Sequence, residues 1–448
     1  MQMGAKVKEW RNLDYSEMVR RLFMTPGEDA MNICREITFQ VTGSCTLCCS
    51  YCYENHKSCG VMSEQTGRKI VDYILDMYAQ DDPKALINHQ TKSLVLSFIG
   101  GEPLLEAQLI ERIGDYYFEQ CFRRDIPLAP YTRISFATNG QLWFTEEAQH
   151  LIRKYHEFLS VTVSIDGVKE LHDAFRVDAE GNGSFDKAYA AFLDGKQKYG
   201  WMASKMTFVP ESTKYLYPSV KMMVEEGCQH INCNYAYEPY YTVEDAREVY
   251  RELVKLSDWL IEAAPDAYVS ILHAPVGTGM GCDDRNYCGG TGNMLSFAPD
   301  GKAYPCIRYA PISIGEEKAS RVCLGSCWDG LYATDEQRKT KEMLDSITRS
   351  SQSSQECMTC PVMEGCGWCS AYNYELYGTP NKRNTNICYC HKGRVLASCY
   401  YYAKKAILRK DVEPKEILLP YEEVEMILGV DDARALFELV EKAKEVSR

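Results

Sequence analysis

Short apolar segments rich in β-branched residues alternate with amphipathic segments of helical period through the first half of this chain. The apolar segments are residues 36–41, 93–99, 132–138, 160–165, 205–209 and 230–235, and the helical segments between them include 67–78, 106–122, 146–158, 185–199 and 217–226. This alternation predicts an α/β fold with a parallel sheet and right-handed crossovers. Six such units predict a partial (β/α)6 TIM-like barrel with one open side, whose loops at the C-terminal strand ends carry the chemistry.

Three cysteines, Cys45, Cys49 and Cys52, follow the first predicted strand in a C-x3-C-x2-C arrangement. Crowded thiolates favour a soft metal, and iron–sulfur clusters are held by cysteine. A four-iron cluster with three protein ligands leaves one iron open to a small molecule. A zinc corner without its fourth ligand and a group of core thiols are the alternative interpretations. Cys48 lies in the same segment, but its spacing to Cys52 does not fit.

The spacing of these cysteines resembles the signature of the radical S-adenosylmethionine (SAM) superfamily. The resemblance implies a [4Fe-4S] cluster whose open iron chelates SAM and which donates the electron that splits it. After the second predicted strand, Gly100, Gly101, Glu102 and Pro103 resemble the GGEP motif of this family, whose glutamate contacts the SAM amino group. A carboxylate can accept hydrogen bonds from an ammonium group, and glycines allow close approach of the backbone. Taken alone, this segment would equally be a turn.

The remaining SAM contacts that the resemblance implies lie at the ends of later strands. Arg176 resembles the arginine that pairs with the SAM carboxylate, a role that suits its bidentate guanidinium group. Tyr51 occupies the aromatic position that faces the adenine. Segments at the ends of the third and fourth strands resemble those that meet the ribose and the carboxylate, and their candidate residues are Thr138, Asn139, Ser164 and Asp166.

Cysteines become frequent between residues 282 and 390, whereas the periodicity weakens, so this segment is predicted to be held together by metal. Its cysteine spacing resembles the SPASM domain of radical SAM maturases, which holds two auxiliary [4Fe-4S] clusters. By position, the resemblance assigns one cluster to Cys282, Cys288, Cys306 and Cys369, and the other to Cys357, Cys360, Cys366 and Cys388.

The cysteine-rich segment departs from the SPASM pattern at one place. Two residues separate Cys366 from Cys369, where that family usually has three. Cys390 is an alternative to Cys388 as the last ligand. A zinc ribbon on the four cysteines of residues 357–369 is the competing interpretation, although zinc ribbons usually separate their knuckles by about 15–20 residues.

Composition limits the classes of protein to which this chain can belong. The chain has 448 residues, of which 45% are hydrophobic and 25% charged, as in ordinary soluble proteins. A formal net charge of −13 argues against a nucleic-acid partner, and without a run of 18 or more apolar residues we expect no membrane span. The lack of a signal-like N-terminal segment predicts a cytoplasmic protein, in an anaerobic organism if the resemblance holds. Because the cytosol keeps thiols reduced, the 21 cysteines then favour metal or redox chemistry over disulfides. The predicted division is an N-terminal extension (1–34), the barrel (35–240), a bridging helical region (241–281), the SPASM domain (282–392) and C-terminal helices (393–448).

The resemblance implies a peptide maturase. In this family a 5′-deoxyadenosyl radical removes hydrogen from a ribosomally made precursor peptide, and a thioether or carbon–carbon crosslink follows. A flavodoxin- or ferredoxin-type reductant would supply electrons. Only about 35 residues precede the predicted barrel, too few for an independent domain. We therefore expect residues 395–448 or a separate protein to bind the leader of the precursor.

Two other functions fit parts of the pattern. An anaerobic sulfatase-maturating enzyme oxidises cysteine or serine to formylglycine, but that family has an aspartate base where this chain has Ile307. Asp283, Asp284 and Tyr309 are conceivable substitutes, and no catalytic residue is assigned. A non-catalytic iron–sulfur scaffold or electron-transfer protein is the third alternative, and it would not need to bind SAM.

Overall fold

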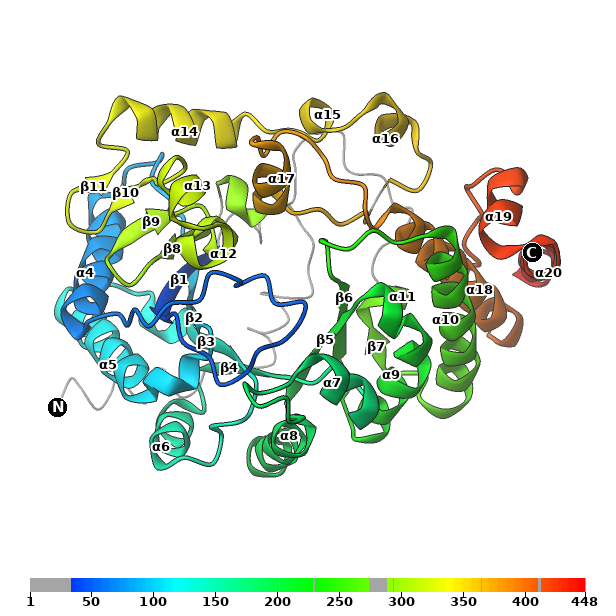
Figure 1. Ribbon diagram of the computed structural model, residues 1–448, viewed down its shortest axis with the longest axis horizontal. Helices are drawn as coiled ribbons and strands as arrows, with labels where there is room; N and C mark the ends of the chain where they lie inside the picture. The colour runs from blue at the N-terminus through cyan, green and yellow to red at the C-terminus, as the bar shows by residue number, and fades with distance from the viewer. Residues whose placement is uncertain are drawn as a thin grey trace.

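The structure is a computed structural model that describes residues 34–200, 202–228, 230–273, 288–292, 294–363, 365–409 and 412–447. Within these ranges one sheet of eleven strands has the order β11-β10-β9-β8-β1-β2-β3-β4-β5-β6-β7. From β1 to β7 every neighbouring pair is parallel, and Figure 1 shows these strands along an arc. Their bounds are β1 (Cys34–Thr42), β2 (Ser93–Gly100), β3 (Thr132–Thr138), β4 (Leu159–Ser164), β5 (Ala203–Phe208), β6 (His230–Tyr235) and β7 (Tyr268–Val269).

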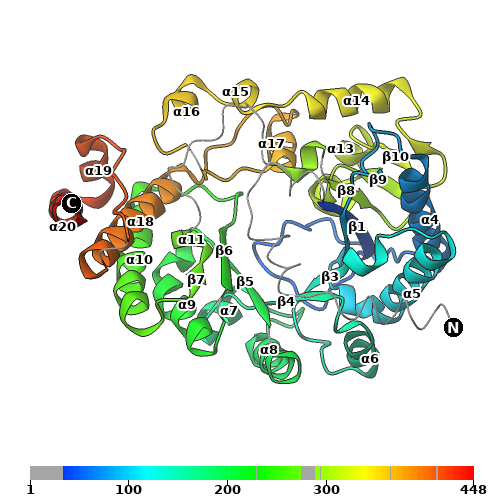
Figure 2. The ribbon, with the colours of Figure 1, turned by 180° about the vertical axis from the view of Figure 1, so that it is seen from behind.

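The helices that connect these strands cover the outer side of the arc (Figures 1 and 2). Local sequence explains where they begin: α4, for example, starts after Ser63, whose side chain accepts a hydrogen bond from the Thr66 amide at 3.0 Å. The bounds of the connecting helices are α4 (Glu64–Gln80), α5 (Ala107–Arg123), α6 (Glu146–Tyr155), α7 (Lys169–Phe175), α8 (Phe185–Tyr199), α9 (Leu216–Glu225) and α10 (Val243–Ala263).

The two faces of the sheet differ in polarity. In β2, Leu94, Leu96 and Phe98 are buried, whereas the intervening Val95 and Ser97 are partly accessible. Because side chains alternate across a strand, one face packs apolar groups under the helices and the other is left open. On β4, β5 and β6 the accessible inner positions are mostly polar: Ser160, Thr162, Ser164, Lys205, Thr207, Asn232 and Asn234.

The cysteine-rich segment extends the same sheet. β8 (Met294–Phe297) pairs in parallel with the free edge of β1, and β9 (Lys302–Tyr304), β10 (Gly325–Ser326) and β11 (Gly330–Leu331) continue it antiparallel. The sheet therefore crosses the predicted boundary at residue 282. Two short helices, α12 (Pro311–Ile314) and α13 (Glu316–Ser320), lie between β9 and β10. The helices after β11 are α14 (Asp335–Asp345), α15 (Arg349–Gln352), α16 (Gln355–Thr359) and α17 (Ser370–Tyr377).

Three helices end the chain: α18 (Cys388–Leu408), α19 (Tyr421–Leu428) and α20 (Val430–Ser447). α18 packs against α10, against α20 and against the short α11 (Ser270–His273). No helix in the described ranges has the length and apolar character needed to cross a membrane.

The α/β prediction with a mostly parallel sheet is confirmed, and all six predicted strands are present. Strands β7 to β11 were not predicted, because runs of two to four residues are too short to show a period. The partial barrel and the domain limits stay predictions.

Candidate functional site

The loop between β1 and α4 carries the three cysteines of the predicted SAM-binding cluster. Its main chain is held against the segment after α7: the Cys48 amide donates to the Val177 carbonyl at 2.7 Å, and the Ser50 amide donates to the Phe175 carbonyl at 3.0 Å. The Cys48 side chain is exposed. Cys48 therefore contributes its backbone to the position of the loop.

Two glycines at the end of β2 leave room for this loop. A Cβ atom at Gly101 would lie 2.3 Å from the carbonyl oxygen of Ser44, and one at Gly100 would lie 2.5 Å from that of Thr42. Both separations are far below contact distance. These glycines therefore allow the main chain of the cysteine loop to pack closely against the end of β2. Pro103, which follows, begins a short 3-10 helix and is buried.

Glu102 is buried and joins the ends of β2 and β3. Its carboxylate accepts hydrogen bonds from the Leu104 amide at 3.1 Å, the Thr138 hydroxyl at 2.7 Å and the Asn139 amide at 2.8 Å. Burial raises the pKa of Glu102 to about 7, although these donors act in the opposite direction. The Asn139 side chain in turn donates toward the sulfur of Cys45 at 3.7 Å. The predicted SAM contacts thus also hold the cysteine loop.

A second network lies at the end of β4. The Asp166 carboxylate accepts hydrogen bonds from the Tyr51 hydroxyl, from Arg176 Nε at 2.7 Å and Nη2 at 3.1 Å, and from the Thr207 amide at 3.0 Å. Burial raises the pKa of Asp166, but the Arg176 charge and these donors outweigh it, so the pKa is below its usual range. The Arg176 guanidinium also lies over the Tyr51 ring at 5.3 Å. Ser164 ends β4 on the accessible inner face.

The three thiols of the loop are close enough to affect one another. Burial raises the pKa of each, and a second cysteine of the loop adds to the rise in every case: Cys52 for Cys45, Cys45 for Cys49, and Cys49 for Cys52. The Lys57 ammonium, which donates to the Leu47 carbonyl at 2.8 Å, lowers all three. Because a cation beside half-buried thiols favours the thiolate that iron binds, this donor set fits an iron–sulfur cluster. Sequence reasoning missed Lys57, although its place in the loop could have indicated it.

The cysteine-rich segment brings its thiols together in two groups. In the first, burial raises the pKa of Cys306, and the charges of Cys288 and Cys369 raise it further. Cys288 Sγ also lies 3.0 Å from the hydroxyl of Ser370. Cys282, the fourth residue assigned to this group, lies outside the described residues.

The second group gathers around the start of α18. Burial raises the pKa of Cys388 to about 11. The Lys392 charge lowers this pKa, whereas the charges of Cys366, Cys360 and Cys357 raise it. These are the four residues that the SPASM resemblance assigns to one cluster. The pKa of Cys390 is raised by burial and by a carboxylate of α10, and the thiols of this group do not contribute. The arrangement favours Cys388 over Cys390.

The described members of these groups do not have the geometry of a single-ion site. Zinc binds thiolates at about 2.3 Å, which requires sulfur atoms within about 4 Å of one another. Across the described ranges, no three His, Cys, Asp or Glu side chains are close enough to hold one metal ion.

Arg308 lies between the cysteine loop and the group of Cys288, Cys306 and Cys369. Sequence reasoning did not predict a role for it. Its guanidinium stacks over the ring of Tyr53 at 4.7 Å and lies 5.9 Å from that of Tyr372. It also pairs with Glu238 at 2.8 Å. The nearby Glu54 is buried, and burial raises its pKa to about 8. The signal that could have found Arg308 is its place two residues after Cys306.

The described residues at and near the position of the missing aspartate base offer no accessible acid. Ile307 is half-buried and apolar. Tyr309 is fully buried, and burial raises its pKa far above the usual range. Asp283 and Asp284 lie outside the described residues.

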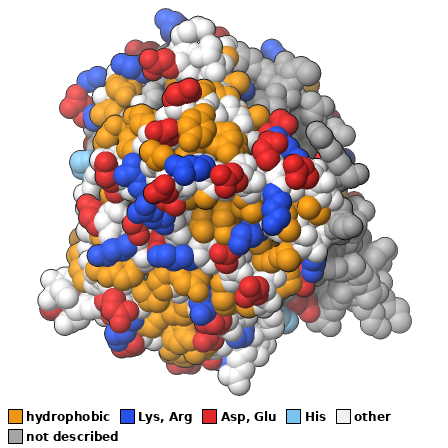
Figure 3. All heavy atoms as spheres, turned by 90° about the vertical axis from the view of Figure 1, so that its right-hand side faces the viewer, with side chains coloured by type: hydrophobic (Ala, Val, Ile, Leu, Met, Phe, Trp, Pro, Cys, Tyr) orange, Lys and Arg blue, Asp and Glu red, His pale blue; other side chains and the backbone are white. Residues whose placement is uncertain are grey.

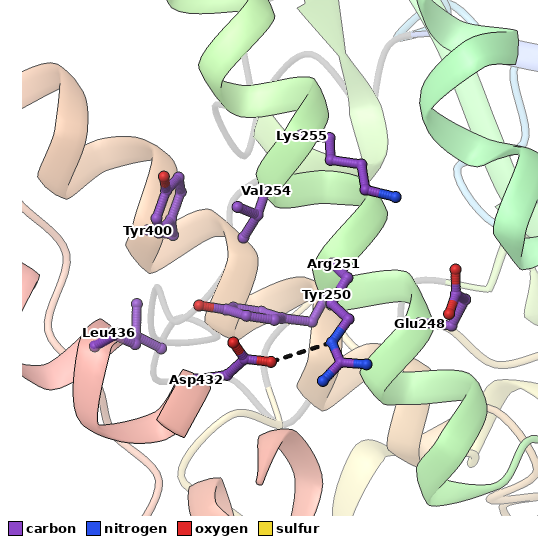
Figure 4. A pocket seen from close by; sticks show the side chains of 9 residues that line it. Glu248, Tyr250, Arg251, Val254, Lys255, Tyr400, Asp432 and Leu436 are labelled. Carbon is purple, nitrogen blue, oxygen red and sulfur yellow. Dashed lines mark hydrogen bonds and ion pairs between the residues drawn. The ribbon is translucent and has the colours of Figure 1, made fainter. Parts of the chain in front are cut away.

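A separate hollow of about 500 Å³ lies between α10, α18 and α20 (Figure 4). An ion pair of Arg251 with Asp432, at 3.1 Å, spans it. Figure 3 shows the face of the molecule that carries the C-terminal helices, where apolar side chains are interspersed with charged ones. The hollow is lined by Glu248, Tyr250, Arg251, Val254, Lys255, Tyr400, Asp432, Ala435 and Leu436.

Comparison with known proteins gives radical SAM enzymes among the relatives, together with uncharacterized proteins. No family model matches the chain. The radical SAM cyclopropyl synthase TigE of Paramaledivibacter caminithermalis is 22% identical over 413 residues, which cover 87% of this chain and 76% of TigE. A cysteine-type anaerobic sulfatase-maturating enzyme of Clostridium novyi is 29% identical over 153 residues, 33% of this chain and 36% of that enzyme. An uncharacterized protein of Methanocaldococcus jannaschii is 31% identical over 150 residues, 34% of this chain, and the match spans less than half (44%) of that relative.

Two solved structures share the fold. The anSMEcpe structure with bound AdoMet (SAM) has a TM-score of 0.60 at 18% identity, covering 83% of this chain and 97% of that one. Streptococcus suis SuiB bound to the precursor peptide SuiA has a TM-score of 0.53 at 13% identity, covering 83% of this chain and 79% of that one. Together with the relatives found by sequence, these likenesses identify the chain as a homologue of the radical SAM enzymes.

Proposed function

We propose that this chain is a radical SAM peptide maturase with a partial barrel and a SPASM domain. One observation carries the proposal. The Glu102 and Asp166 networks fix a loop of three half-buried thiols, Cys45, Cys49 and Cys52, at the C-terminal ends of parallel strands. Ligands bind at these strand ends in α/β folds.

The loop thiols would hold a [4Fe-4S] cluster, which when bound supplies the electron that splits SAM and so releases the hydrogen-abstracting 5′-deoxyadenosyl radical. Glu102 uses three of its roughly four lone-pair positions within the chain, so one is left for the SAM ammonium group. Tyr51, whose ring lies under the Arg176 guanidinium at 5.3 Å, would face the adenine. The loop itself would cover the site and exclude water.

The two further thiol groups would hold auxiliary [4Fe-4S] clusters. Cys288, Cys306 and Cys369, with Cys282, would form one set, and Cys357, Cys360, Cys366 and Cys388 the other. Arg308 connects the first set to the cysteine loop through its stacking on Tyr53. The substrate would therefore meet a site enclosed by both halves of the chain.

The reaction we propose is the formation of a carbon–carbon crosslink in a precursor peptide, with a thioether as the second product to test. Closing a cyclopropyl ring makes a carbon–carbon bond, and the cyclopropyl synthase matches over most of this chain. Formylglycine formation lacks the aspartate base, because Ile307 is apolar. A flavodoxin- or ferredoxin-type protein would reduce the clusters in the cytoplasm, and residues 395–448 or a separate protein would bind the leader.

Mass spectrometry of an anaerobic reaction tests this function. The reconstituted protein receives SAM, a reductant and the short peptide encoded beside its gene. Loss of two hydrogens with every thiol still alkylatable and no new aldehyde supports the carbon–carbon bond, and the same loss with one fewer alkylatable thiol indicates a thioether. A new aldehyde that reacts with a hydrazide probe identifies formylglycine, whether it forms from cysteine with loss of the sulfur or from serine with loss of two hydrogens. If no 5′-deoxyadenosine forms although the clusters are present, the enzyme proposal is wrong and the scaffold alternative holds.

A further inference from the structure

The inner face of the sheet carries a row of polar side chains across three strands. Lys205 on β5 is exposed on this face, whereas its neighbours Ser204 and Met206 are fully buried on the other. In the register of the sheet, Lys205 is paired with Ser164 on β4 and with Asn232 on β6. Because paired residues of neighbouring strands project to the same face, these three side chains lie side by side.

The Lys205 ammonium has no hydrogen-bond or ion-pair partner among the described residues. The charged groups that act on it are those of Arg176 and Asp166. Loss of solvent inside the concave fold lowers the pKa of Lys205, and the Arg176 cation lowers it further against the weaker effect of Asp166. Lys205 is thus an accessible cation for which the described residues supply no ion-pair partner.

Arg176 does not supply a second free cation. Its fork is closed on Asp166 through Nε and Nη2, and the Tyr51 hydroxyl and the Thr207 amide occupy the remaining positions of that carboxylate. The pair is therefore close to neutral. An anion that enters this face would meet Lys205 as the uncompensated charge.

We propose that Lys205, together with Ser164, forms a binding site for a carboxylate group on the inner face of the sheet. An ammonium and a hydroxyl are both donors, and a carboxylate accepts from both. Asn232, next in the row, can donate or accept at the side of the same group.

The carboxylate has two possible sources, and both rest on the proposed function. One is the amino-acid end of SAM, which Ser164 is already predicted to contact. The other is an acidic side chain of the precursor peptide. The register favours SAM, because Lys205 is directly opposite Ser164. Lys205 would then replace Arg176 as the cation that binds the SAM carboxylate.

Equilibrium dialysis of the reconstituted protein tests the site without turnover. The probes are SAM and its decarboxylated analogue, and the proteins are the wild type, Lys205→Met, Lys205→Arg, and the control Lys187→Met, which changes an exposed lysine of α8. A charge-assisted hydrogen bond contributes about 10- to 100-fold in affinity. We expect Lys205→Met to weaken SAM by this factor and to leave the decarboxylated analogue unchanged. Lys205→Arg should restore most of the affinity, and Lys187→Met should match the wild type.

A second arm identifies the peptide as the source. The precursor peptide is supplied with its acidic residues and, separately, with each replaced by the matching amide. If SAM affinity is unchanged but Lys205→Met alone loses the preference for the acidic form, the carboxylate belongs to the peptide. The site is refuted if all four proteins bind SAM equally and none of them distinguishes the acidic peptide from its amide form. A result in which neither form of the peptide is modified counts as no distinction. The proposed function fails separately, when wild-type protein binds SAM but releases no 5′-deoxyadenosine.

Discussion

Glu102 and Asp166 each bind several groups of this chain, and both also lie where the family resemblance places SAM. Glu102 accepts three hydrogen bonds, and Asp166 accepts four. Replacing either would leave buried donors without a partner, which costs about 1–3 kcal/mol for each donor. Loss of activity in such variants would therefore not separate binding from folding. Lys205, which is accessible and has no partner of its own, allows that separation.

His172 provides a pH-dependent share of stability. Its Nδ1 accepts from the Asp166 amide at 3.4 Å, and its Nε2 lies 3.0 Å from the Ser184 hydroxyl, which donates to the Arg176 carbonyl at 2.7 Å. These partners fit a neutral ring that carries its hydrogen on Nε2. Burial, and then the Arg176 charge, lowers the pKa of His172 to about 4.

The expected stability change follows from that lowered pKa. Between the ordinary pKa of about 6.5 and about 4, the unfolded chain binds a proton that the folded chain does not. The free energy of unfolding should thus fall as the pH falls through this window, by up to about 1.4 kcal/mol per pH unit for this group. Urea unfolding at pH 7 and pH 5 should show a smaller decrease in His172→Gln than in the wild type. The exposed-site control His150→Gln should keep the wild-type decrease; equal decreases in all three would contradict the assignment.

At the scale of elements, the end of β2 decides where the cysteine loop can lie. Gly101→Ala would place a methyl group 2.3 Å from the Ser44 carbonyl, so the loop must move away. We expect the variant to keep its circular dichroism spectrum and to lose a large part of the iron bound after anaerobic reconstitution. Gly60→Ala is a matched control in the same loop, because its Cβ would meet nothing closer than 3.5 Å. Equal iron contents in the two variants would show that the glycine does not position the thiols.

Helix α18 separates two cysteines that are two residues apart in sequence. A rotation of about 100° per residue turns Cys388 and Cys390 toward different sides of the helix. Cys388 faces the group of Cys357, Cys360 and Cys366, whereas Cys390 is fully buried among other residues. Cys388→Ala should therefore lose about one of the three proposed clusters, measured as iron and sulfide per chain. Cys390→Ala should keep all of its iron, and the reverse result would make Cys390 the ligand.

Across the whole molecule, sequence reasoning succeeded where a pattern repeats or a spacing is specific. The six alternating units predicted β1 to β6. The cluster assignments drawn from the cysteine spacing stay predictions, although the described thiols of each auxiliary set influence one another. It could not predict that β8 joins β1, because that pairing connects segments about 250 residues apart through a strand of four residues. It also missed Arg308 and Lys57, whose importance depends on neighbours that only the fold brings together.

Arg308 joins three distant parts of the chain: the cysteine loop through Tyr53, the end of β6 through Glu238, and α17 through Tyr372. A stacked, planar guanidinium cannot be replaced by an ammonium without loss. We expect Arg308→Met to lower the free energy of unfolding by about 2–4 kcal/mol and Arg308→Lys by about half as much.

The measurement for Arg308 is urea unfolding, with Arg321→Met as the control. Arg321 pairs with Glu317 on the surface, where its side chain is 67% exposed, so its loss should cost less than about 0.5 kcal/mol. If Arg308→Met is no more destabilising than this control, Arg308 does not fasten the two halves together. If Arg308→Lys matches the wild type, charge alone suffices and the stacking contributes nothing. A large loss in Arg308→Met with an intermediate one in Arg308→Lys would make this residue the link through which the cysteine-rich segment is held over the cysteine loop.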